Sequence, residues 1–206
     1  AWLGAMNGTQ ITGGSTAPIA GLRVGNFSLD GTCTADIGMH LRGVQDSQFE
    51  PIQAANHIAT AYDFDAGSTS GSIFARNNFY GLQAAETATC SAAAVGLKLG
   101  AGNASGNGTE HNNFYGSVLN TTDGTALSVA NARHNNFFGL YSLPTGTGLS
   151  IDLNGNDGAT DFSARYNNFY GADPRGGTTV RATGLDFPSH DTLIHLATGA
   201  PAPTIE

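Results

Sequence analysis

Short runs in which apolar and polar residues alternate recur along the chain. Five of them share the order small, apolar, polar, apolar, and they begin at Gly21, Gly38, Gly96, Ala126 and Gly148. Apolar residues at period two place one face of a β-strand in a core. The pattern therefore predicts inward side chains at Leu22, Val24, Leu97, Leu99, Leu127, Val129, Leu149 and Ile151. It predicts outward side chains at Arg23, His40, Lys98, Ser128 and Ser150.

A second repeat is the pentapeptide Asn-Asn-Phe-aromatic-Gly. It begins at Asn77, Asn112, Asn135 and Asn167, at intervals of 35, 23 and 32 residues. Asn tolerates left-handed backbone angles, so each Asn pair predicts a tight corner with the following Phe turned inward. Stacked corners allow amide and ring ladders. The predicted ladder residues are Asn77, Asn78, Phe79, Asn112, Asn113, Phe114, Asn135, Asn136, Phe137, Asn167, Asn168 and Phe169.

Three further segments are interpreted as diverged copies of this corner: Gly25-Asn26-Phe27, Ser47-Gln48-Phe49 and Leu185-Asp186-Phe187. Repeats at such periods indicate stacked units that bury their apolar faces against their neighbours. One coil of three short strands with turns needs roughly 22 residues. The longer intervals then hold polar insertions, at residues 65–72, 100–109 and 154–160, and the chain is predicted to form about six or seven coils. Helical repeats and propellers do not fit these spacings.

The Asn-Asn-Phe-Tyr-Gly corners and the segment 20–31 resemble the right-handed parallel β-helix of the pectate-lyase-like superfamily, and within it the bodies of viral tailspikes and tail fibres. The similarity covers about residues 20–190. It implies an all-β, right-handed, single-stranded parallel β-helix (a solenoid) over residues 20–196. Residues 1–19 are then an N-terminal lead-in, and residues 197–206, rich in Pro and Ala, resemble a linker-like tail.

The composition limits the partners. The formal charge is −8, with one lysine among 206 residues, so no basic surface for nucleic acid or an anionic membrane is expected. No apolar run is long enough to predict membrane insertion. Only 12% of residues are charged, well below the usual quarter, which suits a virion or extracellular particle and contact with hydroxylated glycans. Cys33 and Cys90 lie far apart in the sequence and could pair only if the coils bring their Cα atoms within about 7 Å. They are interpreted as buried free thiols.

The residues before each Asn pair form a candidate glycan-binding stripe. In aligned corners, neighbouring members lie about 4.8 Å apart on the outside of the stack. Arg and His offer hydrogen bonds to a sugar chain and Tyr offers a stacking face, while a solvated strand edge or a subunit contact stays open as the alternative. The candidate substrate-binding residues are Arg76, Glu110, His111, Arg133, His134, Arg165 and Tyr166.

Asp63 and Asp65 are the candidate catalytic residues. They lie two apart in Tyr-Asp-Phe-Asp, so on a strand they share one face. Glycoside hydrolysis uses two carboxyl groups, one to protonate the leaving oxygen and one to activate water or attack carbon. The alternative is a pair of solvated acids beside a loop.

No cofactor is required by the sequence, although calcium has one candidate site. Asp152, Asn154, Asn156 and Asp161 place oxygen ligands at alternate positions, but the Gly comes one place late and the closing Glu is missing. We interpret this segment as a polar turn. The predicted outward strand face carries bases without an acidic cluster, so the calcium ligands and base of a lyase are not assigned to this chain.

The resemblance favours the β-helical body of a bacteriophage tailspike or tail-fibre-like virion protein. Such a body would assemble as a homotrimer and bind, and in some cases degrade, host surface polysaccharide. One alternative is a secreted pectate-lyase-like lyase, hydrolase or epimerase. A second is a structural spacer without a ligand.

Overall fold

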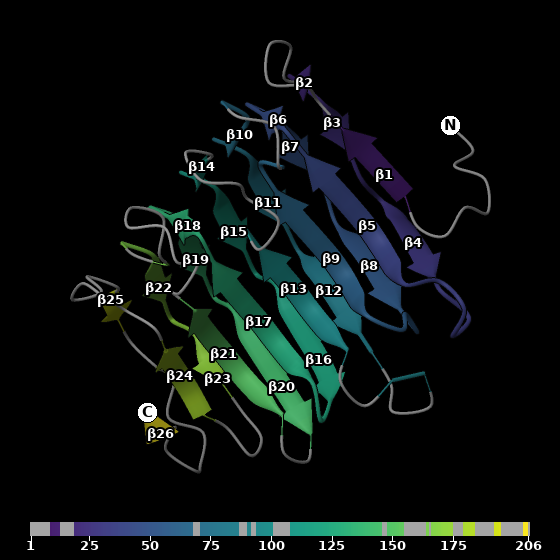
Figure 1. The fold of residues 1–206 in the computed structure, drawn as a ribbon, viewed down its shortest axis with the longest axis vertical. Helices are drawn as coiled ribbons and strands as arrows, with labels where there is room; N and C mark the ends of the chain where they lie inside the picture. Colours follow the sequence, from purple (N-terminus) through teal and green to yellow (C-terminus); the bar gives the residue numbers. More distant parts are fainter. Residues whose placement is uncertain are drawn as a thin grey trace.

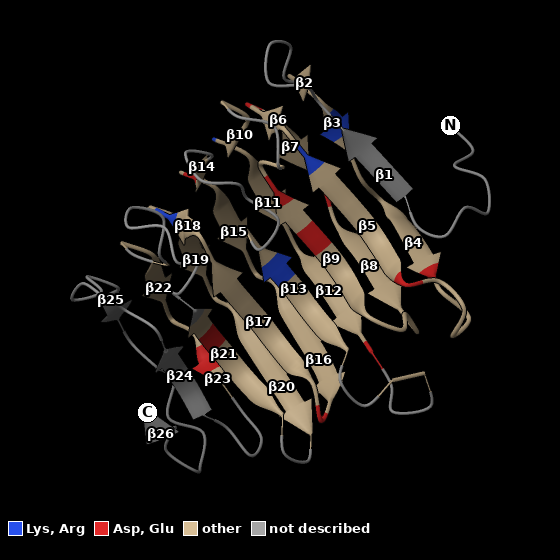
Figure 2. Cartoon of the chain, viewed as in Figure 1, with Lys and Arg blue, Asp and Glu red and all other residues tan. Residues whose placement is uncertain are grey.

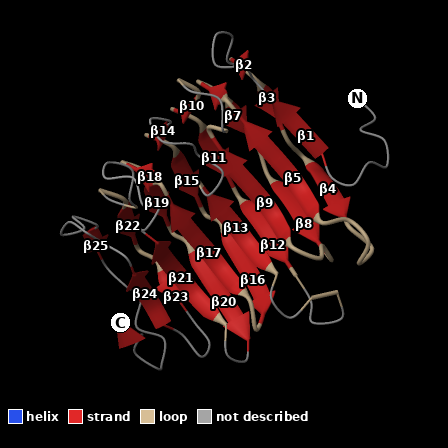
Figure 3. Cartoon of the chain, in the orientation of Figure 1, coloured by secondary structure: helices blue, strands red, loops and turns tan. Residues whose placement is uncertain are grey.

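Parallel strands stacked into four sheets make up the described structure (Figures 1 and 3). The computed structural model describes residues 9–12, 19–67, 71–86, 90–91, 94–100, 108–145, 148–154, 164, 166–174, 179–183, 192–194 and 204–205. Strands, turns and bends account for the regular structure of these residues, and no helix occurs among them. Accordingly, none of them belongs to a helix with the length and apolar character needed to cross a bilayer.

Two of the sheets are here named A and B. Sheet A contains, in spatial order, β1 (Thr9–Thr12), β5 (Ile37–Arg42), β9 (Thr60–Asp65), β13 (Val95–Leu99), β17 (Thr125–Ala130), β21 (Leu149–Asn154), β24 (Thr179–Thr183) and β26 (Thr204–Ile205). Sheet B contains β18 (Ala132–Arg133), β14 (Gly108–Glu110), β10 (Ile73–Ala75), β6 (Val44–Gln45) and β2 (Ile19–Ala20). Sheet A therefore takes one strand from the predicted lead-in and one from the predicted tail.

Sheets C and D complete the architecture. Sheet C contains β25 (Thr192–Ile194), β22 (Asn168–Tyr170), β19 (Asn136–Phe138), β15 (Asn113–Tyr115), β11 (Asn78–Tyr80), β7 (Gln48–Phe49) and β3 (Arg23–Val24). Sheet D contains β23 (Asp173–Pro174), β20 (Tyr141–Thr145), β16 (Val118–Thr122), β12 (Leu82–Ala85), β8 (Ile52–Ala55) and β4 (Phe27–Asp30). From β5 to β20 the chain passes through sheets A, B, C and D in a fixed order, which is consistent with a parallel β-solenoid.

Two strands of sheet A, β5 and β17, share one burial pattern. In both, the second, third and fifth residues are buried, so two consecutive residues are buried before the alternation resumes. A small residue fills the first buried position, as Gly38 does in β5. A Cβ on Gly38 would lie 2.6 Å from the carbonyl oxygen of Ala61. This crowding explains the small residue that opens the predicted unit.

The predicted register of β21 is wrong by two residues. Thr125 pairs with Leu149 and Leu127 with Ile151, so Ser150 is the buried small residue and Asp152 takes the outward position. Leu149 is only half-buried. Arg23 is exposed, as predicted, but it lies on sheet C rather than beside His40 and Lys98 on sheet A, because β3 pairs with β7. The other predicted inward residues are buried or half-buried.

The pentapeptide corners stack in register. The inward Phe rings form a continuous column in which neighbouring ring centroids lie 4.6–4.8 Å apart. The column contains Phe49, Phe79, Phe114, Phe137 and Phe169, all with an exposed fraction of 1% or less. The predicted stack is confirmed, and Ser47-Gln48-Phe49 is a true diverged copy.

The two outermost copies were placed wrongly. Val24 pairs with Phe49, so the first copy is Leu22-Arg23-Val24 rather than Gly25-Asn26-Phe27. At the other end, Leu193 of β25 pairs with Phe169. Residues 185–187 lie outside the described residues.

The left-handed residue of each corner is not the first Asn, as predicted, but the residue before it. Arg76, His111, His134 and Tyr166 have φ of 56–57°. The Asn is fully buried, and its side-chain oxygen accepts hydrogen bonds from the preceding coil. For example, Asn135 Oδ1 accepts from the backbone N and from Nδ2 of Asn112, each at 3.0 Å. At the bend, the side-chain oxygen of the Asn thus takes the place of the backbone carbonyl oxygen that accepts a hydrogen bond within a strand.

Two amide columns run along sheet C in opposite directions. In the buried column (Asn77, Asn112, Asn135, Asn167), each Nδ2 donates to the next Asn toward the C-terminus, at 3.0 Å. In the outer column (Asn78, Asn113, Asn136, Asn168), each Nδ2 donates toward the N-terminus, at 2.9–3.0 Å. The predicted ladder of Asn side chains is therefore present as two separate amide columns.

Cys33 and Cys90 form a disulfide, so the interpretation of two free thiols is wrong. Their Cα atoms lie 4.6 Å apart although 57 residues separate them in the sequence. Cys33 follows β4 and Cys90 follows β12, and the backbone N of Cys33 donates to the carbonyl of Asn56 in the connection between them. The disulfide therefore links the connection after β4 to the connection after β12, and the connection after β8, which contains Asn56, lies between them. Stacking of the coils brings the cysteines together, and cysteine spacing alone did not reveal this.

Breaking this disulfide is expected to lower the free energy of unfolding by about 2–4 kcal/mol, because the unfolded chain is no longer constrained by the closed loop. Urea unfolding of the oxidised protein and of the double variant Cys33→Ser/Cys90→Ser measures the difference. Reductant should lower the midpoint of the parent and leave that of the variant unchanged. An equal response of both proteins to reductant would contradict the assignment.

Candidate functional site

The outer face of sheet A gathers charged side chains from three neighbouring strands. His40 of β5 pairs in register with Asp63 of β9, and Asp63 pairs with Lys98 of β13. Arg42 pairs likewise with Asp65. Figure 2 shows the acidic residues of β9 between basic residues of β5 and β13. The expectation that this face lacks an acidic cluster is wrong, because Asp63 and Asp65 share it as their spacing predicted.

Asp65 is fully engaged by its neighbours. Its oxygens accept from Nε and Nη2 of Arg42, at 2.8 and 3.1 Å, and lie 3.3 Å from Nε2 of His40. Its side chain is 1% exposed. Burial raises the pKa of Asp65, but the hydrogen bonds from His40 and Arg42 outweigh burial and leave the pKa below its ordinary value. Asp65 is thus a structural anion and is not open to a substrate.

Asp63 has the opposite environment. Burial raises the pKa of its carboxyl group, and the positive charges of Lys98 and His40 offset this only in part. Its Oδ1 is buried and has no hydrogen-bond partner. The two carboxyl groups predicted as a catalytic pair are therefore unequal: Arg42 and His40 hold Asp65, whereas Asp63 keeps one oxygen without a partner among the described residues.

The oxygen and nitrogen atoms of His40, Asp63 and Asp65 lie within 4.8 Å of one another, close enough to hold a metal ion. However, the guanidinium of Arg42 already occupies Asp65 with two hydrogen bonds. A bound cation would lie beside this positive charge. The geometry therefore favours an ion-pair network over a metal site.

The calcium candidate is not assembled by the described residues. Asp152 and Asn154 belong to strand β21 rather than to a turn, and Asp152 occupies the outward column of sheet A beside Ser128. Asn156 and Asp161 lie outside the described residues. The interpretation of Asp152 and Asn154 as part of a polar turn is wrong, since the strand continues through both.

Asp63→Asn and Asp65→Asn are expected to change stability in opposite directions. The folded protein disfavours ionised Asp63, whose pKa is raised, so Asp63→Asn should raise the melting temperature at pH 7. The gain should disappear well below pH 3.8, where the carboxyl group is protonated in both the folded and the unfolded chain. Asp65 stabilises the fold when ionised, and its contribution is lost as pH falls through its lowered pKa.

Asp65→Asn should therefore lower the melting temperature at pH 7 and less so in acid. Thermal unfolding of the two variants and the parent across the pH range measures both effects. A loss of stability at pH 7 in both variants would show that Asp63 is also held by a partner in the folded chain.

Three residues of the predicted glycan-binding stripe, Arg76, His111 and Tyr166, are exposed on the outside of the corners, and His134 is half-buried. His111, His134 and Tyr166 stack on one another, with ring centroids 5.0 and 4.9 Å apart. Arg76 forms an ion pair with Asp46 of the preceding coil, at 2.7 Å. Because stacked rings cover one another's faces, these side chains present mainly their edges, with their nitrogen and hydroxyl groups, to a ligand.

Glu110 and Arg133, two other predicted members, pair with each other at 2.7 Å on sheet B. Both are partly buried, so they add less accessible polar surface than Arg76, His111 or Tyr166. Arg165 lies outside the described residues.

A second outer column escaped the prediction. Tyr80, Tyr115, Phe138 and Tyr170 occupy the aromatic fourth position of the pentapeptide, and their rings stack at 4.9–5.0 Å. The signal was present in the sequence, since a residue next to an inward Phe on a strand points outward. The outer face of sheet C therefore carries the Asn78 amide column and the Tyr80 ring column side by side, with the exposed stripe at its corner.

Comparison with known proteins adds no relative. Neither a scan against protein-family models nor searches of curated proteins and of solved structures found a match to this chain.

Proposed function

We propose that the chain is the β-helical body of a bacteriophage tailspike or tail-fibre-like protein and that it binds host surface polysaccharide on the outer face of sheet C. In this proposal the sheets form a right-handed, single-stranded parallel β-helix of about six or seven coils. The body assembles on the virion as a homotrimer. Light scattering of the purified chain tests the trimer.

The observation that carries the proposal is the choice of residues at the left-handed corners. A left-handed backbone costs roughly 1–2 kcal/mol for most residues, and Gly or Asn avoids much of this cost. Gly21 occupies the corresponding corner of the first coil, with φ of 71°. The second corner carries Asp46, and the four corners that follow carry Arg76, His111, His134 and Tyr166. Backbone strain retained at exposed planar side chains is typical of functional surfaces.

The chemistry of the face suits a hydroxylated polymer. Ring nitrogens, phenol hydroxyls and amides recur at the spacing of the strands, and the two outer columns contain no charged residue from Asn78 to Tyr170. The rings are fixed by stacking before any ligand arrives, so little side-chain entropy is lost on binding. Such an array binds an extended chain through many repeated hydrogen bonds.

The triple variant Arg76→Asn/His111→Asn/His134→Asn is expected to bind polysaccharide at least about tenfold more weakly, since three contacts each contribute about 0.5–1.5 kcal/mol. Its melting temperature should be unchanged or higher, because Asn tolerates the left-handed corner. Binding is measured on immobilised bacterial capsule and O-antigen polysaccharides.

Asp123→Asn is the matched control. Asp123 is exposed and left-handed, with φ of 53°, but lies between sheets D and A. This control should bind like the parent. Full binding by the triple variant would exclude the stripe as the binding surface, and absence of binding by the parent to every polysaccharide would favour a structural spacer.

A secreted polysaccharide-degrading enzyme is the second candidate function, favoured by Asp63. A partly buried carboxyl group with a raised pKa and a free oxygen is suited to donate a proton to a leaving oxygen. No second accessible carboxylate accompanies it among the described residues, since Asp65 is held by Arg42. Cleavage of a polysaccharide by the parent and its loss in Asp63→Asn would establish this function.

A further inference from the structure

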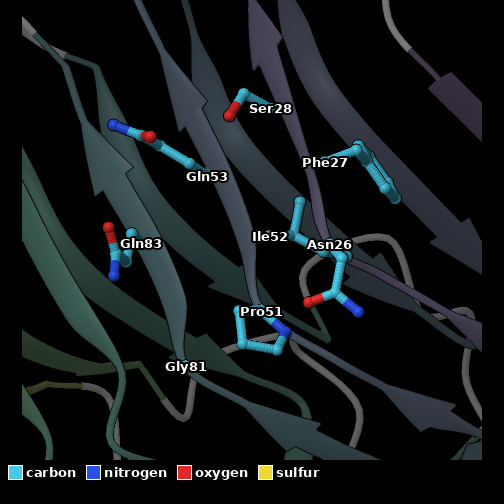
Figure 4. Close-up of a pocket in the computed structure, with 8 residues that line it drawn as sticks. All are labelled: Asn26, Phe27, Ser28, Pro51, Ile52, Gln53, Gly81 and Gln83. Carbon is cyan, nitrogen blue, oxygen red and sulfur yellow. The ribbon is translucent and has the colours of Figure 1, made fainter.

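A shallow hollow lies on the outside of the first coils, next to the corner between sheets C and D. Its volume is about 260 Å³, and it is lined by Asn26, Phe27, Ser28, Pro51, Ile52, Gln53, Gly81 and Gln83. Figure 4 shows the side chains of Ser28, Gln53 and Gln83 along the neighbouring strands β4, β8 and β12, with Pro51 and Gly81 at the corner. The hollow is open and smaller than the pockets that hold drug-sized ligands, which begin at about 300 Å³.

The floor of the hollow is fixed from inside the core. The hydroxyl of Tyr62, on sheet A, lies 2.7 Å from the carbonyl oxygen of Ile52 and 2.8 Å from that of Gln83. Tyr62 is fully buried, so this contact ties two of the lining strands to the opposite side of the core. A hollow with such support keeps its shape when a ligand binds.

The polar groups of the hollow are free. Gln53 and Gln83 pair in register on adjacent strands, as Asn78 and Asn113 do in sheet C. Asn113 donates to Asn78 at 3.0 Å. In contrast, the side chains of Gln53, Gln83, Ser28 and Asn26 form no hydrogen bond with any residue that the structure describes. Donors and acceptors for a ligand therefore come from the amides of Gln53 and Gln83, the amide of Asn26 at the corner, and the hydroxyl of Ser28.

The lining contains no charged residue, and the exposed Pro51 at the corner adds apolar surface. A pyranose matches this combination, because it presents hydroxyl groups at its edge and C–H groups on its faces. A uronate or a sulfated sugar would leave its negative charge without a cationic partner. The hollow also directly follows the ring column of sheet C, since Gly81 is the next residue after Tyr80.

We propose that this hollow is a subsite for one neutral hexose unit, recognised by the amides of Gln53 and Gln83. The proposal rests on the proposed function in one respect: the hexose is taken to be part of the polysaccharide that crosses the corner from sheet C. The amides form hydrogen bonds with the hydroxyl groups, and Pro51 contacts the ring. The substrate class is then a polysaccharide with neutral hexoses.

Nuclear magnetic resonance of the folded chain tests the subsite. D-glucose, D-galactose, D-mannose and D-galacturonate are titrated separately, and the side-chain amide signals of Gln53 and Gln83 are followed. At least one neutral hexose should shift these signals to saturation with a Kd on the order of millimolar. The variant Gln53→Ala/Gln83→Ala should bind that hexose at least about tenfold more weakly.

Val118→Ala is the matched control, because Val118 follows Gln83 in the same outward column. It should bind the hexose like the parent. Shifts that stay linear for every hexose, equal binding by the double variant, or tighter binding of galacturonate would each overturn the subsite. Hexose saturation without polysaccharide binding would support the hollow and overturn the role of sheet C. Polysaccharide binding that depends on the corner stripe, without hexose saturation, would support the role of sheet C and overturn the hollow as a subsite.

Discussion

Replacement of Phe137 by Ala is expected to lower the free energy of unfolding by about 3–5 kcal/mol. Phe137 is fully buried within the Phe column, and its ring stacks on Phe114 at 4.8 Å and on Phe169 at 4.7 Å. Its removal leaves a cavity between two close-packed rings that the strands hold at a fixed spacing. Urea unfolding followed by circular dichroism measures the loss.

Phe138→Ala is the control for this variant. Phe138 is the next residue and also stacks on two rings, Tyr115 and Tyr170, but on the half-buried outer face. The Phe138→Ala variant loses the same number of ring contacts as Phe137→Ala but creates no internal cavity, so its loss of stability should be smaller. Equal losses in the two variants would show that ring stacking, rather than core packing, stabilises the corner.

Replacement of Asn135 by Ala is expected to cost up to about 6 kcal/mol. The substitution removes the acceptor of two buried donors, the backbone N and Nδ2 of Asn112. Each buried donor left without a partner costs about 1–3 kcal/mol. The midpoint of urea unfolding should fall accordingly.

Asn136→Ala provides the comparison on the outer column. Asn136 donates to Asn113 at 2.9 Å and accepts from Asn168 at 2.9 Å, but it is only half-buried, so water replaces both bonds. Its cost should stay below about 1 kcal/mol. If Asn135→Ala were no more destabilising than Asn136→Ala, the buried amide column would not be the element that stabilises the bend.

The repeat predicted the stack of strands and its register because identical residues occupy equivalent positions in successive coils. Phe79, Phe114, Phe137 and Phe169 could be aligned from the sequence alone. The prediction was wrong where the repeat has diverged. The first copy holds Val24 in the position of Phe, and β21 has an additional apolar residue, Leu149, that imitates the start of the strand unit.

The candidate sites depend on contacts that periodicity does not encode. The spacing of Asp63 and Asp65 placed both on one face, but only the register of β5 against β9 shows that Arg42 engages Asp65 and not Asp63. Likewise, the left-handed angle falls one residue before the Asn because the buried amide is needed as an acceptor at the bend. The hollow beside Pro51 arises where sheets C and D meet, and no local motif marks it.

The opposed directions of the two amide columns have an electrostatic consequence. A row of aligned amides sums its dipoles, as the peptide groups of an α-helix do, and leaves partial charges at its ends. Here the buried row points its donors toward the C-terminus and the outer row points them toward the N-terminus. The two rows cancel, so each further coil lengthens the column without adding to a field at either end. A stack of coils built in this way can be lengthened without a new electrostatic cost.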